Sequence, residues 1–251
     1  MLNFGGSMFT RLLGLLSAVS FSMSIATAAD FQRVKENISG TNSDQTIEYD
    51  ALNEGAVPSA KLINSKLKSD LVEKNCGISD ESNNTYEAEA SLVVLTKDKY
   101  VTFNVLSEKY CGGLYPEALS YYSVFDSVTG EKIDFNKEVP VQNSSGDSVD
   151  WTARGTYQNE LAAVIFNAIP ADSETLDVEG CFGGLSKEET IQQIALYSPA
   201  VLAIVKNKKI VLGIDPPHVA AFCKFEVTVG FEKVAKYFAP KSKVRKWAKQ
   251  K

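Results

Sequence analysis

The stretch Thr85–Val105, TYEAEASLVVLTKDKYVTFNV, contains a strong secondary-structure pattern. Apolar and polar residues alternate in both of its halves, and such alternation places successive side chains on opposite faces of a strand. The charged residues 97–99 (KDK) interrupt the alternation, as is typical of a turn. The stretch therefore predicts an antiparallel hairpin whose first strand is half-buried.

Similar patterns predict further elements on both sides of this hairpin. A helix is expected to open at Pro58 and Ser59, because Ile63, Leu67 and Leu71 share one helical face, with an apolar residue at position 62 alongside. Further helices are expected over 152–168, ended by a proline at position 170, and from 231 onward. The other expected strands cover 31–38, 46–49, 118–126, 191–196, 201–205, 210–214 and 221–229.

The order of these elements indicates an α+β fold with antiparallel sheets, each packed by a helix. A polar, turn-rich segment at 140–150 separates two halves, 30–139 and 140–251. Each half reads as a helix with antiparallel strands, and the second ends in a basic tail.

Residues 1–29 have the features of a secretory signal peptide. A single charge, Arg11, precedes an apolar run that ends in Ala26-Thr27-Ala28-Ala29. An uncleaved membrane anchor is the alternative, but the run of 18 residues is short and diluted by serines, whereas a spanning helix needs about 20 apolar residues. We therefore expect a periplasmic or secreted protein that begins near Asp30.

Four cysteines follow the predicted cleavage site: Cys76, Cys111, Cys181 and Cys223. An even number in an exported chain indicates two disulfides, for which three connectivities exist. We favour Cys76–Cys111 and Cys181–Cys223, because each pair lies within one half. A zinc site is the alternative, but it needs closely spaced cysteines and usually histidines, and this chain has one histidine. We expect no metal and no cofactor.

No motif in the sequence predicts a catalytic site. The single histidine, His218, has no recognisable nucleophile or orienting carboxylate arranged around it, and neither a G-x-S-x-G nor an H-E-x-x-H motif occurs. The sequence thus favours a binding protein over an enzyme and gives no catalytic residue. A cell-wall glycan hydrolase or deacetylase with an unrecognised carboxylate site stays open as the alternative.

The segment after the hairpin predicts a structural turn. Gly112 and Gly113 permit positive φ, and Pro116 makes the exit rigid. Tyrosines flank this turn and are candidates for a binding surface, with half-buried strand residues as the alternative interpretation. The candidate binding residues are Tyr110, Tyr115 and Tyr121.

The charge distribution of the chain limits its partners. The formal net charge is −5, which argues against nucleic-acid binding. The tail 239–251 holds six basic residues around Trp247 and no acid. It can contact an anionic surface, or it can be a helix end whose cations suit the helix dipole.

Three passages resemble one bacterial family of domains of unknown function. They are the Tyr110–Pro116 segment (YCGGLYP) with the Asp126-x-x-Thr129-Gly130 turn behind it, Val211–Ala221, and Phe225–Phe231. The family occurs in lysozyme-sensing anti-sigma factors and as an accessory domain beside a peptidoglycan deacetylase. Leu114 and Tyr115 depart from its Ala-His pair, so no ligand role is carried over from that histidine.

The resemblance implies an exported, envelope-associated binding module whose partner is an envelope protein or a glycan ligand, such as lysozyme or peptidoglycan fragments. The segment before the apolar run is too short for a sigma-binding region, so an anti-sigma factor is not expected. One histidine cannot supply the paired histidine ligands of a deacetylase.

Overall fold

The computed structural model describes residues 30–38, 45–75, 84–111, 116–139, 151–170, 181–205, 208–214, 216 and 223–249. Several predictions fall outside these residues and stay predictions. They concern the signal peptide, the boundary at 140–150, Cys76, Gly112, Gly113, Tyr115 and His218.

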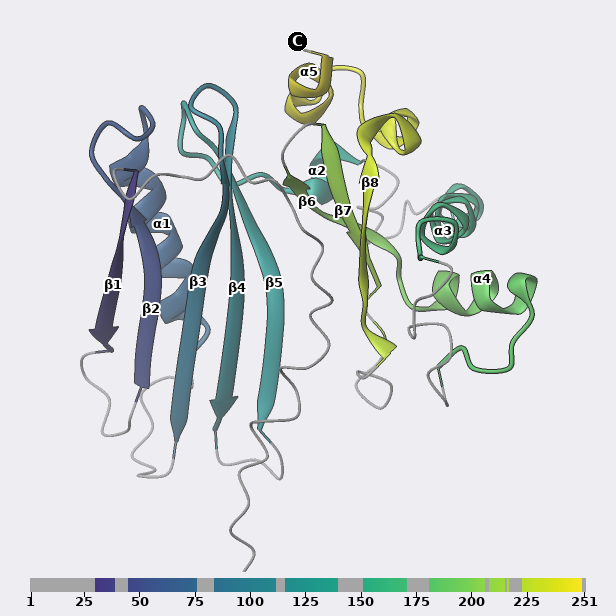
Figure 1. Ribbon diagram of the computed structural model, residues 1–251, viewed down its shortest axis with the longest axis horizontal. Coiled ribbons are helices and arrows are strands. Elements are labelled where there is room, and N and C mark those ends of the chain that lie inside the picture. Colours follow the sequence, from purple (N-terminus) through teal and green to yellow (C-terminus); the bar gives the residue numbers. More distant parts are fainter. Residues whose placement is uncertain are drawn as a thin grey trace, which may run out of the picture.

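A five-stranded sheet dominates the N-terminal part of the chain (Figure 1). Its strands lie in chain order: β1(Phe31–Asn37), β2(Gln45–Leu52), β3(Thr85–Leu95), β4(Tyr100–Tyr110) and β5(Glu117–Asp126). The expectation of an antiparallel sheet is wrong at one place, because β2 pairs with β3 in parallel. The helix α1(Ala60–Glu73) forms the crossover that such a parallel pair requires.

The predicted hairpin is confirmed as β3 and β4. In β3, Tyr86, Ala88 and Ala90 are buried, whereas Glu87 and Glu89 are exposed, as their alternation predicts. The first half of β4 is different, since the four residues 100–103 are all buried. One face of this segment packs toward α1 and the other toward the C-terminal part of the chain.

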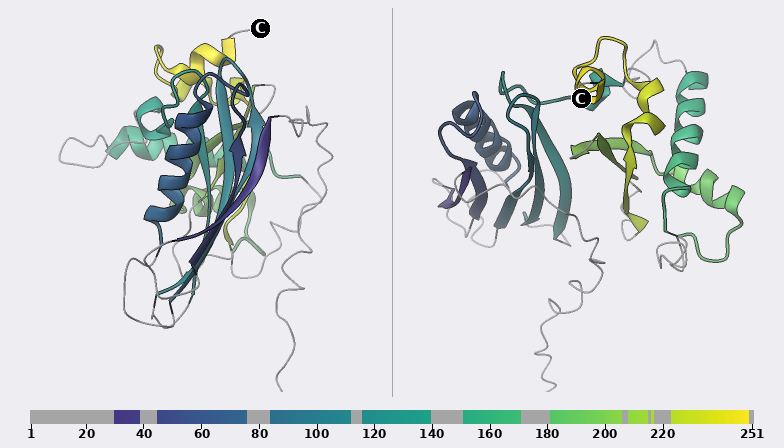
Figure 2. Two further views of the ribbon diagram at one scale, coloured as in Figure 1. Left: turned by 90° about the vertical axis from the view of Figure 1, so that its left-hand side faces the viewer. Right: turned by 45° about the horizontal axis from the view of Figure 1, so that its top comes forward.

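Helix α1 covers one face of the sheet and forms a core with it (Figure 2). Ile63, Leu67 and Leu71 are 0% exposed, which confirms the predicted apolar face. Leu62, expected alongside them, is instead 44% exposed and lies over Gly130. Ser59 precedes the helix and fixes its start, because its N–H and its hydroxyl both donate to the Ser127 carbonyl.

A second, antiparallel sheet lies beside β5 and is ordered β6(Ala200–Val205), β7(Lys209–Gly213) and β8(Glu226–Gly230). Four helices belong to this part of the described chain (Figure 1): α2(Phe135–Glu138), α3(Trp151–Phe166), α4(Lys187–Leu196) and α5(Lys243–Lys249). The predicted helix at 152–168 is confirmed as α3, where Tyr157, Leu161 and Ile165 are buried. Strand β8 begins at Glu226, five residues later than predicted.

The predicted strand at 191–196 is wrong, because these residues belong to α4. The helix begins with a capping box in which the Ser186 hydroxyl accepts from the Glu189 N–H and the Glu189 carboxylate accepts from the Ser186 N–H. Thr190 and Ile194 then bury one face at the i, i+4 spacing of a helix. The S-x-x-E pattern was present in the sequence, and it is stronger evidence for a helix than the short apolar run is for a strand.

The predicted final helix from Phe231 is also wrong in form. The chain makes two short 3₁₀ turns, η5(Phe231–Lys233) and η6(Ala235–Tyr237). Phe231, Val234 and Phe238 are buried, so the apolar spacing marked the core-facing residues correctly. A regular helix resumes only at α5, within the basic tail.

One complete disulfide lies within the described residues, Cys181–Cys223, as predicted, with Cα atoms 5.5 Å apart. Cys111 is also disulfide-bonded. Cys76 lies outside the described residues, so the predicted Cys76–Cys111 bridge stays a prediction.

A second core joins the two sheets. It combines Tyr100, Val124 and Ile133 from the N-terminal part with apolar residues of α3, α4 and the second sheet. At the edge strand β6, Thr102 donates its hydroxyl to the Ile204 carbonyl at 2.8 Å. None of the described helices is long and apolar enough to cross a bilayer.

Candidate functional site

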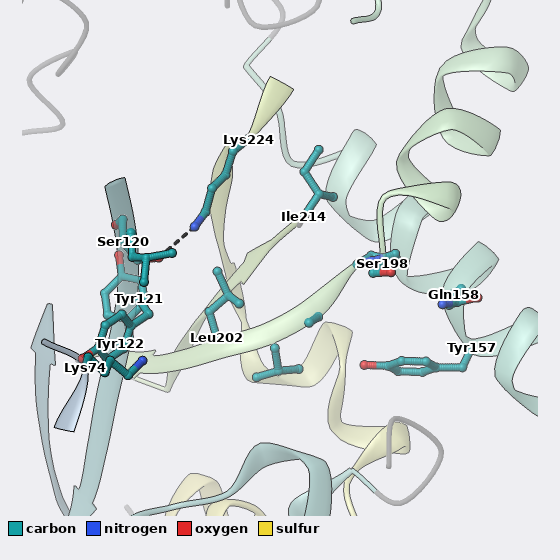
Figure 3. Close-up of a pocket in the computed structure, with 14 residues that line it drawn as sticks. Lys74, Ser120, Tyr121, Tyr122, Tyr157, Gln158, Ser198, Leu202, Ile214 and Lys224 are labelled. Atoms are coloured by element: carbon teal, nitrogen blue, oxygen red, sulfur yellow. Dashed lines mark hydrogen bonds between the residues drawn. The ribbon is translucent and has the colours of Figure 1, made fainter. Parts of the chain in front are cut away.

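A cavity of about 530 Å³ lies beyond the edge strand β5, between it, β6 and the middle of α3 (Figure 3). We call it the β5 cleft. Figure 3 shows tyrosines of β5 on one side and two residues of α3 on the other. Its described lining residues are Lys74, Leu119, Ser120, Tyr121, Tyr122, Tyr157, Gln158, Ser198, Pro199, Ala200, Val201, Leu202, Ile214 and Lys224.

Strand β5 contributes two neighbouring tyrosines that lean to opposite faces of the sheet. Tyr122 packs against the second core and donates its hydroxyl to Glu226 at 2.7 Å. Burial, followed by the Glu226 carboxylate, raises the pKa of Tyr122. Tyr121 packs against the α1 core, and burial likewise raises its pKa. Its buried hydroxyl has no hydrogen-bond partner among the described residues.

Two lysines give the cleft a positive charge. Lys74, just after α1, places its Nζ 3.7 Å from the centroid of the Tyr121 ring, in cation–π contact. Burial, followed by repulsion from Lys132, lowers the pKa of Lys74. Lys224 donates from Nζ to the Ser120 carbonyl at 2.7 Å (Figure 3). None of the described lining residues carries a carboxyl group, so the cleft suits an anionic ligand.

The far wall of the cleft is set by a turn between α4 and β6. Ser198 in this turn has φ of 49°, a left-handed conformation that is uncommon for a residue with a side chain. Tyr197 before it packs edge-on against Phe182, with ring centroids 6.2 Å apart, and Phe182 packs in turn on Phe225 at 5.7 Å. This aromatic cluster adjoins the Cys181–Cys223 bridge, so one rigid unit positions the residues on both sides of it, Ser198 and Lys224.

The sheet face opposite α1 carries a second depression, of about 540 Å³. We call it the acidic sheet face, after the carboxylates that line it. Glu87 on β3 lies directly opposite Glu108 on β4, and neither forms an ion pair among the described residues. Leu106, which lies opposite Glu89 on the same face, is 47% exposed. The four glutamates of this face are Glu48, Glu87, Glu89 and Glu108.

Arg33 on β1 neutralises the other edge of this face. It forms ion pairs with Glu48, Asp50 and Glu89 at 2.7, 2.9 and 2.5 Å. Burial alone would lower the pKa of Arg33, but the hydrogen bonds that it donates to these carboxylates raise it. Lys35 and Lys224 also line this depression. The two of its four glutamates that form no ion pair among the described residues are Glu87 and Glu108, which face each other across β3 and β4.

The predicted binding tyrosines are not brought together within the described structure. Tyr121 lines the β5 cleft. The residue opposite it on β4 is Val105, which precedes Tyr110 by five residues on the same strand. The backbones of Tyr110 and Tyr121 are therefore roughly 16 Å apart along the sheet. Pro116 is exposed just before β5 begins, and Tyr115 lies outside the described residues. A binding role for these three tyrosines stays a prediction.

Most residues of the cleft were not found from the sequence. Lys74, Tyr157, Gln158, Ser198 and Lys224 come from separate segments that share no motif. One local signal was available, because Lys224 adjoins a predicted disulfide. Among the described residues, no group of three or more His, Cys, Asp and Glu side chains could hold a metal ion.

No protein-family model matches this chain, and no curated protein matches it. Among solved structures, the chain is similar to a DUF3298 family protein from Bacteroides fragilis, with a TM-score of 0.44 and 13% identity over 89% of this chain and 98% of the other. It is also similar to a DUF3298 family protein from Pseudomonas aeruginosa PAO1, with a TM-score of 0.38 and 8% identity over 86% and 94% of the two chains.

Proposed function

We propose that this protein is an exported, envelope-associated binding module and that its β5 cleft recognises peptidoglycan fragments. The observation that carries the proposal is the cleft lining, in which two lysines and three tyrosines surround a cavity without a described carboxylate. Peptidoglycan fragments combine sugar rings with free carboxylates. Tyrosine rings offer rigid apolar area and a polar end to sugars, and ammonium groups pair with carboxylates.

The same lining favours binding over hydrolysis at this cleft. Glycoside hydrolysis normally uses two carboxyl groups that flank the scissile bond. Glu226, a carboxylate near the cleft, accepts a hydrogen bond from Tyr122 and is not among the described lining residues. A ligand in the cleft would meet hydroxyl, amide and ammonium groups, which bind and orient it.

Calorimetric titration of the mature protein with purified muropeptides tests this proposal. Replacing Lys224 by Met removes one ammonium group, and we expect about tenfold weaker binding from the loss of a charge-assisted contact. Lys187→Met on α4, outside the cleft, is the matched control and should bind like the wild type. Mass analysis of the recovered ligand should show it intact. Equal affinity of the Lys224 and Lys187 variants, or cleaved ligand, would refute the proposal.

Recognition of lysozyme is the second candidate, and the acidic sheet face favours it. Lysozyme is a cationic protein, and the unpaired carboxylates of Glu87 and Glu108 would attract it. Under this candidate, Glu87→Gln with Glu108→Gln weakens lysozyme capture on a biosensor, and raised salt weakens it further. Glu54→Gln with Glu188→Gln makes the same charge change at exposed positions elsewhere and should have little effect.

A further inference from the structure

Three basic segments that are far apart in sequence meet at one end of the molecule. The β3–β4 turn and α5 lie together at this end in both views (Figures 1 and 2). Tyr100, at the start of β4, connects them, because its ring lies 5.6 Å from the Trp247 ring of α5. Its hydroxyl also donates to the Val205 carbonyl at 3.1 Å, just before the β6–β7 turn. The fold thus fixes the positions of three lysine-bearing segments around one tyrosine.

Five exposed lysines on these segments have no ion-pair partner within the described structure. None of them lines the β5 cleft or the acidic sheet face. Asp98 is the acidic residue on the same β3–β4 turn. We call this surface the lysine-rich end; its lysines are Lys97, Lys208, Lys241, Lys246 and Lys249.

Helix α5 is held against the body, so its charges are presented in one orientation. Val244 is buried, and Lys243 pairs with Asp126 at 3.1 Å and Glu131 at 2.8 Å. Lys246 and Lys249 remain exposed, and their i, i+3 spacing places them on one side of the helix. Residues 243–249 of the basic tail therefore form a docked helix that displays fixed cations.

The lysine-rich end also exposes aliphatic side chains. Val128, in the turn after β5, is 52% exposed, and the N–H of its neighbour Ser127 donates to the Lys99 carbonyl of the β3–β4 turn. Leu62, 44% exposed, lies over Gly130 of the same turn. Exposed aliphatic groups among lysines suit the boundary between lipid headgroups and acyl chains, whereas a soluble polyanion would use the lysines alone.

We propose that the lysine-rich end binds the surface of a membrane that contains anionic phospholipids. The lysines pair with lipid phosphates, and Val128 and Leu62 enter the interfacial layer. This inference is independent of the proposed ligand of the β5 cleft, because none of these residues lines the cleft. A folded protein with an intact cleft and no affinity for vesicles would leave the proposed function standing and remove this inference.

Vesicle co-sedimentation at low salt tests the inference with two lipid compositions, phosphatidylcholine alone and phosphatidylcholine with about 30% phosphatidylglycerol, which gives the vesicle a negative surface potential. We expect the mature protein to bind only the anionic vesicles and to be released by about 0.5 M salt. A juxtamembrane lysine is worth about a factor of five, so Lys246→Gln with Lys249→Gln should weaken binding roughly 30-fold. Lys35→Gln with Lys187→Gln, which removes two lysines from other surfaces, should stay within about twofold of the wild type.

A second variant separates a membrane from a soluble polyanion. Val128→Ser removes exposed apolar surface without changing charge and should weaken vesicle binding about threefold. Equal binding to both lipid compositions would overturn the inference. So would a Val128→Ser variant that binds vesicles like the wild type while the lysine variant does not, because that result indicates a polyanion site.

Discussion

Lys243 at the start of α5 forms an ion pair with Asp126 at the end of β5, with Nζ and Oδ2 3.1 Å apart. The other carboxylate oxygen of Asp126 accepts from the N–H groups of Val128 and Thr129, both at 2.9 Å. One side chain therefore closes the turn after β5 and attaches the C-terminal helix to the N-terminal sheet. The Asp-x-x-Thr-Gly pattern noted in the sequence serves this purpose.

The first prediction concerns the pH dependence of this contact. Burial alone would raise the pKa of Asp126, but hydrogen bonds from Thr129, Lys243 and Val128 lower it below its usual value of 3.8. A carboxylate with a lowered pKa contributes stability above its unfolded pKa and loses that contribution as the pH falls through the folded pKa. We expect Asp126→Asn to destabilise the protein by a constant amount above about pH 5 and by less below pH 4.

Urea denaturation of both proteins from pH 3 to pH 7 measures this difference. Glu54→Gln, at an exposed position away from the turn, serves as the control and should show no such convergence. A gap between wild type and Asp126→Asn that is the same at every pH would contradict the assignment.

The second prediction compares three glycines that differ in backbone φ and in the space that a Cβ atom would find. Gly130 has φ of 70°, and a Cβ there would lie 2.8 Å from Cδ2 of Leu62. Gly55 has φ of 90° with open space around it, and Gly155 lies inside α3 with open space. We expect Gly130→Ala to cost about 2–3 kcal/mol, Gly55→Ala about 1 kcal/mol, and Gly155→Ala to stabilise by up to about 1 kcal/mol. Thermal unfolding checks the order, and a Gly130→Ala variant no worse than Gly55→Ala would exclude the contact with Leu62.

The third prediction tests the hydrogen bond that a side chain of β4 donates to a backbone carbonyl of the edge strand β6. Thr102 is 0% exposed and its hydroxyl donates to the Ile204 carbonyl. Thr102→Val keeps the shape and removes the donor, so we expect a loss of about 1–2 kcal/mol in unfolding free energy. Ser123 is the matched control, because its buried hydroxyl has no hydrogen-bond partner among the described residues. Ser123→Ala should be neutral or slightly stabilising, and an equal cost for both variants would argue against the edge contact.

The fourth prediction concerns the Cys181–Cys223 bridge. It closes a loop with a sequence separation of 42 residues. By the chain-entropy estimate, replacing both cysteines by Ala should cost about 4 kcal/mol of stability. Because Lys224 and the aromatic cluster adjoin the bridge, we also expect weaker muropeptide binding from the variant where it is still folded. Denaturation and titration give the two measurements, and unchanged affinity would show that the aromatic cluster alone holds the wall of the cleft.

Short-range patterns in the sequence were enough to identify several elements. The alternation around Tyr86 and Phe103 predicted the hairpin, and the spacing of Ile63, Leu67 and Leu71 predicted α1, because side-chain direction in a strand or helix repeats over a few residues. The separation of the cysteines into two halves correctly predicted the pairing of Cys181 with Cys223. The Ser186–Glu189 cap was equally local, and the strand predicted over α4 missed it.

Other features depend on contacts between distant segments, and only the tertiary structure decided them. The parallel pairing of β2 with β3 follows from the packing of α1 across the sheet, which no alternation within either strand encodes. Tyr100 is buried on the face that its alternation marked as polar, because the second sheet covers it. Likewise, Lys74, Tyr157 and Lys224 line one cleft only because the end of α1, the middle of α3 and the segment before β8 approach each other. Sequence periodicity determines which face of a helix or strand is apolar. Whether the opposite face is buried or lines a cleft depends on the elements that pack near it, and these come from distant parts of the chain.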